Sequence, residues 1–270
     1  MKKTIITLII IALTATIMLA SGQKREARNV SEFTGINASG SFEIIVTKGN
    51  SVSLHIEADE EIMQYIHSKV QGGVLQLYID NNKKTKNIKI LRAFVVMKNL
   101  EQVTLSGACS LTTRDIFTPT KFKSDCCGAT SMILNLDTQQ LNIDASGTSK
   151  INVKANVKQE VKIDISGVSK FYGELNAASV TCYSSAVSFI NLQGSANDLR
   201  IDLSGTSCID VGNFVTKNAI VGASGVSNVT VNAKEQLKIS ASGMSSVTYI
   251  GSPKVSIDCS ETTIIKNINY

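Results

Sequence analysis

Apolar and polar residues alternate on both sides of a short core with the pattern Ser-Gly-x-Ser. Before one such core, Leu141, Ile143 and Ala145 alternate with polar residues, and after it Ile151 and Val153 do the same. Alternation with a period of two is typical of a strand that buries one face. Glycine suits a corner, because it adopts positive φ without a steric cost. Each copy is therefore predicted to be a strand, a corner and a second strand.

This unit recurs nine times, at spacings of 18 to 21 residues. One copy cannot bury its apolar face alone, but stacked copies can, with about 4.8 Å between equivalent positions. The pattern predicts an all-β protein, a right-handed parallel β-helix (β-solenoid) with about 19–20 residues per coil. The first residue of each core, called position zero below, is Ser106, Cys127, Ser146, Ser166, Ser185, Ser204, Ser224, Ser242 or Ser260.

Serine also recurs three residues after position zero. Stacked hydroxyls in these two positions are expected to hydrogen-bond along the stack and to the backbone of the turn. This predicts a structural turn ladder, and no serine differs from its copies as a catalytic nucleophile would. Its defining residues are Ser146, Gly147, Ser166, Gly167, Ser204, Gly205, Ser224 and Gly225.

The segment before the repeats has a different pattern, apart from a first corner at Ser39-Gly40. The stretch ADEEIMQYIHSKVQGG has apolar residues at helical spacing, with Asp59 able to cap a helix and Gly72-Gly73 able to end it. We expect a small α+β cap region with one helix. Strands are expected over residues 52–56, 74–79 and 88–97, with a basic loop over residues 81–87.

The first residues have the features of a secretory signal peptide. Lys2 and Lys3 precede an apolar run over residues 5–20, and small residues follow it. No cysteine lies near the expected cleavage site, so a lipoprotein anchor is not predicted, and no integral membrane span is expected after cleavage. The predicted divisions are a signal peptide (1–22), a linker (23–32), an N-terminal segment (33–100), β-helix repeats (101–265) and a tail (266–270). We therefore expect export to the periplasm or the cell surface.

Net charge gives no indication of a nucleic-acid partner. Without residues 1–22 the chain has 25 basic and 22 acidic residues, a formal net charge of +3. Such a weak, scattered positive charge is not the footprint of nucleic-acid binding.

An acidic row is the main candidate for chemistry. Aspartate recurs two residues before position zero, in a slot predicted to face outward. Stacked carboxylates would repel one another, so they need neutralising groups. Solvated ion pairs with Lys123, Lys162 and Arg200 are one interpretation; calcium bound between coils and a polysaccharide-binding face are the others. The row comprises Asp125, Asp144, Asp164, Asp202 and Asp258.

Six cysteines in an exported chain raise the question of disulfides. Cys126, Cys182 and Cys259 fall in inward slots and are predicted to be buried apolar residues. Cys109 and Cys127 fall in serine slots of adjacent coils, where a bridge between them is an alternative. No Cys-x-x-Cys spacing points to a metal site, and no cofactor is predicted.

The N-terminal segment resembles a known family. Phe33-Thr34-Gly35-Ile36-Asn37, then Ser39-Gly40-Ser41-Phe42 and the acidic ADEEIM stretch, are similar to the head GIN domain family, described as auto-transporter adhesins of Bacteroidetes-type bacteria. The resemblance extends over residues 33–265, including the repeats. It implies an exported, β-helical, non-enzymatic protein of the cell envelope, with no catalytic residues to transfer.

Three functional hypotheses follow. The first is a non-catalytic, adhesin-like binding or structural module whose partner is a glycan or an extracellular or envelope protein. The second is a polysaccharide-active enzyme that uses the acidic row, which requires acids converging in a cleft. The third is a self-associating envelope protein, because a stack of coils has open ends that can pair into a homo-oligomer.

Overall fold

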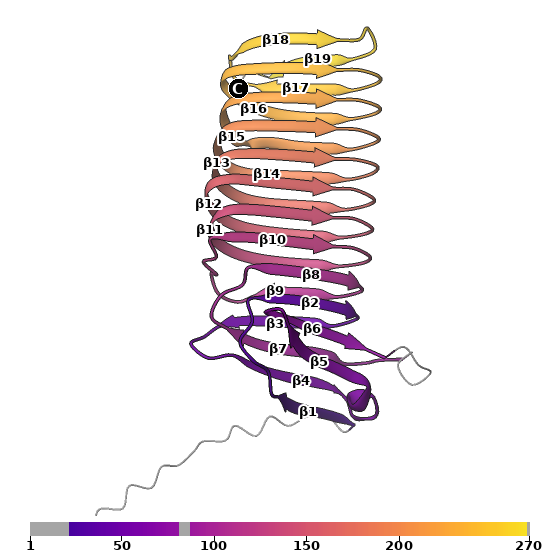
Figure 1. The fold of residues 1–270 in the computed structure, drawn as a ribbon. Helices are drawn as coiled ribbons and strands as arrows, with labels where there is room; N and C mark the ends of the chain where they lie inside the picture. The colour runs from indigo at the N-terminus through magenta and orange to yellow at the C-terminus, as the bar shows by residue number, and fades with distance from the viewer. Residues whose placement is uncertain (1–21, 81–86, 269–270) are drawn as a thin grey trace, which may run out of the picture.

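The structure is a computed structural model that describes residues 22–80 and 87–268. The predicted signal peptide, apart from Gly22, and most of the basic loop lie outside these residues. The described chain forms one sheet system of nineteen strands and a single short helix. Figure 1 shows a column of stacked coils that rises from the indigo N-terminal end to the yellow C-terminal end. The predicted all-β solenoid is confirmed.

Six long strands form the middle of the column, and each contributes to both faces of a coil. Each of these strands pairs in parallel with the next one along the chain. The pairing is interrupted in the middle of the strand by a register shift or a gap, which marks the bend of the coil. The Ser-Gly-x-Ser corners connect one strand to the next. The strands are β11 (Ser131–Ala145), β12 (Lys150–Ile165), β13 (Lys170–Ser184), β14 (Phe189–Leu203), β15 (Cys208–Ala223) and β16 (Asn228–Ala241).

The core is a set of apolar stacks between the two faces. One stack runs through Ile143, Ile163, Cys182, Ile201, Val221 and Ile239, whose positions are paired in register and whose side chains are all fully buried. Burying one such large apolar side chain contributes about 1.5–3 kcal/mol. The alternation seen in the sequence therefore translates directly into inward and outward rows.

The first coils are not stacked in chain order. Strands β2 (Gly35–Gly40) and β3 (Glu43–Lys48) form a coil through the Ser39-Gly40 corner. Strand β2 pairs with both β6 (Val74–Ile79) and β8 (Gln102–Gly107). Strand β3 likewise lies between β7 (Leu91–Met97) and β9 (Ser110–Thr113). The solenoid therefore begins at β2, before the predicted boundary at residue 101.

Antiparallel strands cover the N-terminal end of the column. Strand β4 (Ser53–Asp59) pairs with β7 on one edge and with β1 (Gln23–Arg28) on the other. Strand β5 (Ile66–Gln71) pairs with β6 as a hairpin. The prediction of a linker over residues 23–32 is thus wrong for the part that forms β1, because its backbone pairs with the free edge of β4.

A short 3-10 helix, η1 (Glu60–Tyr65), lies where the longer helix was predicted. Its predicted continuation to Gln71 is wrong, and the cap region is nearly all β rather than α+β. Gly72 and Gly73 both have positive φ, 58° and 74°, and form the tight turn of a hairpin instead of ending a helix. The backbone of β5 thereby pairs with the edge of β6, whose donors and acceptors a helix over the same residues would have left unpaired.

The C-terminal end of the column has no such cover in the described residues. Its strands are β17 (Ser246–Ile250), β18 (Lys254–Cys259) and β19 (Ile264–Ile268), while β10 (Lys121–Cys126) precedes the long strands. The predicted tail over residues 266–270 is wrong up to Ile268, since β19 pairs with β17 through that residue. Within the described residues, no helix has the length and apolarity needed to span a membrane.

Ala186 allows the strain of the left-handed corner conformation to be tested. It occupies the glycine slot of its coil and is the single non-glycine residue with positive φ, 61°, in the described chain. A left-handed conformation costs an L-residue about 1–2 kcal/mol, part of which glycine's greater unfolded-state freedom cancels. We expect Ala186→Gly to raise the free energy of unfolding by about 0.5 kcal/mol or more, measured by chemical denaturation.

The matched control for this prediction is Ala129→Gly, at an exposed corner residue that does not have positive φ. That change should be neutral or slightly destabilising, because glycine only adds freedom to the unfolded chain there. Equal effects of the two substitutions would show that the corner conformation carries no strain.

Candidate functional site

The turn ladder is held together by backbone contacts between glycines of successive coils. The amide of Val168 donates to the carbonyl of Gly147, and that of Thr148 donates to Gly128, both at 2.7 Å. Gly147 has a φ of 73°, and a Cβ added there would lie 2.7 Å from the carbonyl oxygen of Gly128. Glycine is therefore needed both for its positive φ and for the close approach of the coils.

The serines three residues after position zero are buried inside these corners. The Ser149 hydroxyl donates to the carbonyl of Ser146 at 2.7 Å, and the same bond recurs at Ser188, Ser207 and Ser245. The hydroxyls of Thr130 and Ser149 also lie 2.8 Å apart across two coils. Such hydroxyls satisfy turn carbonyls, which is a structural task.

The predicted acidic positions lie in one row of outward residues near the ends of the strands of one face, but the carboxylates are consecutive only from Asp125 to Asp164. Asp125, Asp144 and Asp164 are direct neighbours on β10, β11 and β12. Asp202 does not touch this trio in register, because Tyr183 of β13 lies between it and Asp164. Gly222, Ser240 and Asp258 occupy the following positions of the same row.

Asp144 lies in the middle of the trio and is half-buried. Burial raises the pKa of its carboxyl group above the ordinary value. The nearby Lys123 and Lys162 lower this pKa, while the charges of Asp164 and Asp125 raise it further. Among the described residues, Arg200 forms the expected ion pair with Asp202, whereas Lys123 and Lys162 act on Asp144 through their charge without a salt bridge. Burial, the largest cause, therefore raises the pKa of Asp144 although lysine charges lie nearby.

Asp202 has a defined partner of its own. The Arg200 guanidinium donates to both carboxylate oxygens, at 2.8 Å from Nε and 3.2 Å from the terminal nitrogen. Asp202 and the Tyr183 hydroxyl both raise the pKa of Arg200, the first through a hydrogen bond and charge. The two-point contact orients the Asp202 carboxylate along the face and fixes the position of Arg200 beside Tyr183.

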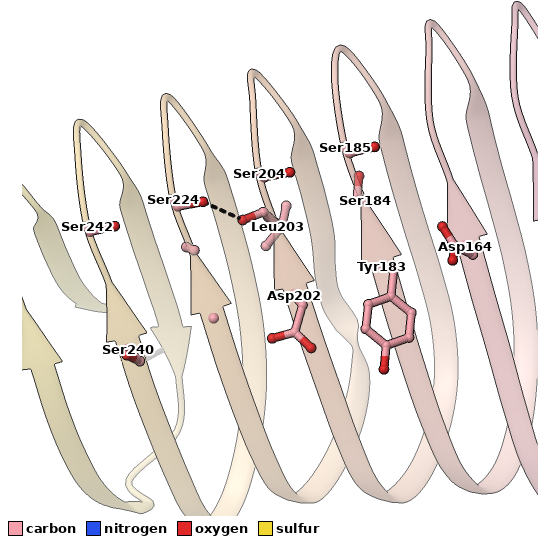
Figure 2. Close-up of a pocket in the computed structure, with 12 residues that line it drawn as sticks. Asp164, Tyr183, Ser184, Ser185, Asp202, Leu203, Ser204, Ser224, Ser240 and Ser242 are labelled. Atoms are coloured by element: carbon pink, nitrogen blue, oxygen red, sulfur yellow. Dashed lines mark hydrogen bonds between the residues drawn. The ribbon is translucent and has the colours of Figure 1, made fainter.

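A shallow groove follows this row, with a volume of about 500 Å³. It runs over five strands, β12 to β16, from Asp164, past Tyr183 and Asp202, to Ser240. Figure 2 shows these side chains on one face of consecutive strands, near the strand ends, with the corner serines beside them. Gly222 leaves the groove open, because a Cβ there would lie 2.7 Å from Asp202 Oδ1. The corner residues that complete the lining are Ser184, Ser185, Leu203, Ser204, Ala223, Ser224 and Ser242.

Sequence reasoning identified the aspartates but missed Tyr183, Gly222 and Ser240. The signal was present, since each lies two residues before position zero of its coil. A second polar groove, of about 280 Å³, lies on another face around Tyr172, with Asn152 and Asn191 on either side. It too was missed, because its residues lie outside the corner motif.

The described residues do not support a metal site or a disulfide. No three histidine, cysteine or acidic side chains there lie close enough together to hold a metal ion. All six cysteines are free thiols, so the alternative of a Cys109–Cys127 bridge is wrong. Burial raises the pKa of Cys126 and of Cys182 to about 12, so both thiols stay protonated and act as apolar core residues.

Together, these features define a class of protein: a parallel β-solenoid with rows of polar side chains on flat faces. The family model described as "Putative auto-transporter adhesin, head GIN domain" matches residues 32–160 and 153–253. The chain belongs to this family.

Solved structures share the fold at low identity. A protein described as a "putative adhesin" from Parabacteroides distasonis ATCC 8503 gives a TM-score of 0.71 at 15% identity, covering 91% of this chain and 97% of that one. A "putative adhesin" from Parabacteroides merdae ATCC 43184 gives 0.69 at 15% identity, covering 92% and 97%. A "Putative lipid binding protein" from Parabacteroides distasonis ATCC 8503 gives 0.67 at 16% identity, also covering 92% and 97%. The sequence matches none of the curated proteins compared.

The raised pKa of Asp144 predicts a pH-dependent effect on stability. A folded pKa above the unfolded value, about 3.9, means that stability falls as pH rises between the two values. Asp144→Asn removes this penalty, so it should raise the free energy of unfolding at pH 7, by no more than about 1 kcal/mol at this half-exposed site. Urea denaturation at pH 7 and pH 3 checks this, with no gain expected at pH 3. An equal gain at both pH values would assign the effect to packing.

Proposed function

We propose that the protein is an exported, non-catalytic, adhesin-like module of the cell envelope that binds a glycan along the groove from Asp164 to Ser240. The family and its structural neighbours, described as adhesins, support an adhesin-like role at the cell envelope. The order of side chains along the groove is the observation that supports a glycan as the ligand. Tyr183 offers an aromatic surface, and the carboxylates of Asp164 and Asp202 flank it as acceptors.

These groups match the chemistry of a polyhydroxylated chain. Sugar hydroxyls are donors that carboxylates accept, and the apolar face of a sugar ring packs on an aromatic ring. Arg200 beside Tyr183 adds fixed donors for sugar oxygens or for an acidic substituent. Because the coils repeat about every 4.8 Å, a linear polymer lying along the column meets polar groups at regular intervals.

The same arrangement favours binding over catalysis. Glycoside hydrolysis requires two carboxyl groups that flank the scissile bond from different sides. Asp144, Asp164 and Asp202 project from one face of the sheet in a single line. The groove is also shallow, which supports binding rather than cleavage of a polysaccharide.

Export rests on the N-terminal sequence. The two lysines, the apolar run over residues 5–20 and the small residues after it are typical of a signal peptide. The mature chain would then begin near Gln23, at the start of β1.

The test is binding of residues 23–270 to a glycan array, with and without calcium, followed by titration of each hit with variants. Tyr183→Ala should weaken binding at least about tenfold, the equivalent of 1.4 kcal/mol. Asp202→Asn should weaken it too, while leaving the fold intact because the side chain is partly exposed.

Tyr172→Ala is the matched control, since it removes an equivalent aromatic ring from the second groove. Its affinity should equal that of the parent chain. Loss of binding through Tyr172 alone would move the site to the other face, and the absence of any glycan hit would contradict the proposed ligand class.

A further inference from the structure

The two ends of the column differ in the number of charged residues on their edge strands. At the N-terminal end, β1 places four charged residues within six positions, QKREAR. Glu26 pairs with Lys24 at 2.7 Å and with Arg28 at 3.2 Å. Dense charge on an edge strand opposes the addition of another strand, because pairing would bring these groups against a new backbone and its side chains.

The C-terminal end has two edge strands with fewer charges, two on β18 and one on β19. Among the described strands, β18 pairs with β16 alone, and β19 pairs with β17 alone. Each therefore presents a row of backbone donors and acceptors on its outer edge. Figure 1 shows β18 at the end of the column, with no described strand beyond it.

The apolar core is also open at this end. Val255 and Ile257 stack on the buried Leu237 and Ile239, and Ile265 stacks on the buried Val247. Ile257 nevertheless remains 53% exposed, although it continues a stack that is fully buried in every preceding coil from β11 onward. No charged residue points inward on β18 to block a further coil. Free edges and an open core together define a surface that pairing with another strand would complete.

We propose that a second copy of this chain covers the open end, with β18 pairing antiparallel to β18 of that copy. The sequence of β18, KVSIDC, is self-complementary in this arrangement. With Ser256 on the twofold axis, Lys254 faces Asp258 of the second copy, and Val255 faces Ile257. Symmetry repeats each pair, so two opposite-charge pairs form on the outer face and two apolar pairs form on the core side.

The asymmetry of the ends limits the assembly to two copies. A twofold interface uses the same surface on both chains and therefore closes on itself. Head-to-tail stacking would need the charged β1 edge to accept β18, and its charges oppose this. The dimer would place the acidic rows of both copies on one longer column, which would increase the avidity of the proposed glycan site without depending on it.

Cysteine cross-linking tests the register. In an antiparallel pair, facing Cα atoms lie about 4.5–5.5 Å apart, within the range that a disulfide spans. We expect Ser256→Cys, with Cys127 and Cys259 changed to serine, to form a covalent dimer under mild oxidation. Ser240→Cys in the same background is the control, because it is exposed on β16, one coil away from the end. Cross-linking of both variants alike, or of neither, would overturn the proposed pairing.

Charge reversal tests the same pairing without cysteines. Lys254→Glu places two glutamates opposite two aspartates and should weaken the dimer about tenfold in sedimentation velocity. Adding Asp258→Lys restores opposite charges and should restore the dimer. A parent chain that is monomeric at all concentrations, assemblies that grow beyond two copies, or a double variant that stays weak would each contradict the proposal. Glycan binding by a monomeric parent chain would leave the proposed function intact.

Discussion

The close contact between corner glycines is the constraint on which the rest of the structure depends. Each left-handed glycine lets the backbone of one coil approach the neighbouring coil. The amide of the residue after the glycine then donates to the corner carbonyl of the preceding coil, at 2.7–2.8 Å for Thr148, Val168 and Val226. A side chain at Gly167 would lie 2.5 Å from the carbonyl oxygen of Gly147. Because such contacts recur in successive coils from Ala108 to Val226, they fix the height and the register of these coils. Inward residues then stack into a core, and outward residues stack into rows.

Because the corners set the register of the coils, the outward residues can differ between coils while the fold stays the same. An outward slot can hold aspartate, tyrosine, glycine or serine without disturbing the corner, as the row from Asp125 to Ser240 shows. The chemistry of the groove arises from this variation. Gly222 opens it, Tyr183 interrupts the line of carboxylates, and Arg200 holds Asp202 in place. Burial raises the pKa of Asp144, and the neighbouring lysines and aspartates shift that pKa in opposite directions.

The hydrogen bonding that stacks the coils also creates two ends at which the stack must stop. Antiparallel strands and a charged edge close the N-terminal end, through contacts made by segments outside the repeats. In the part of the chain that the structure describes, the C-terminal end consists of repeat strands alone, and no strand pairs with the outer edges of β18 and β19. A flat face suited to a long ligand and an end suited to another copy are thus consequences of the same architecture.

The sequence by itself determined the repeat unit. The alternation around Ser146, the glycine at Gly147 and the period of the corners predict the coil, and they place Cys126 and Cys182 in the core, where the structure finds them buried. Counting two residues back from each corner would also have found Tyr183 and Gly222. These features could be predicted because each depends on residues close together in the chain.

Only the tertiary structure decided the cap and the details of the groove. The apolar residues from Ile62 to Val70 fit a helix by spacing, yet Ile66–Gln71 becomes a strand because the edge of β6 is there to receive it. The coil of β2 and β3 lies between coils that follow it in the chain. The two-point contact of Arg200 with Asp202 depends on side-chain geometry. Repeated local patterns are visible in a sequence, whereas the pairing of distant segments is decided by which free edges and surfaces meet in the folded chain.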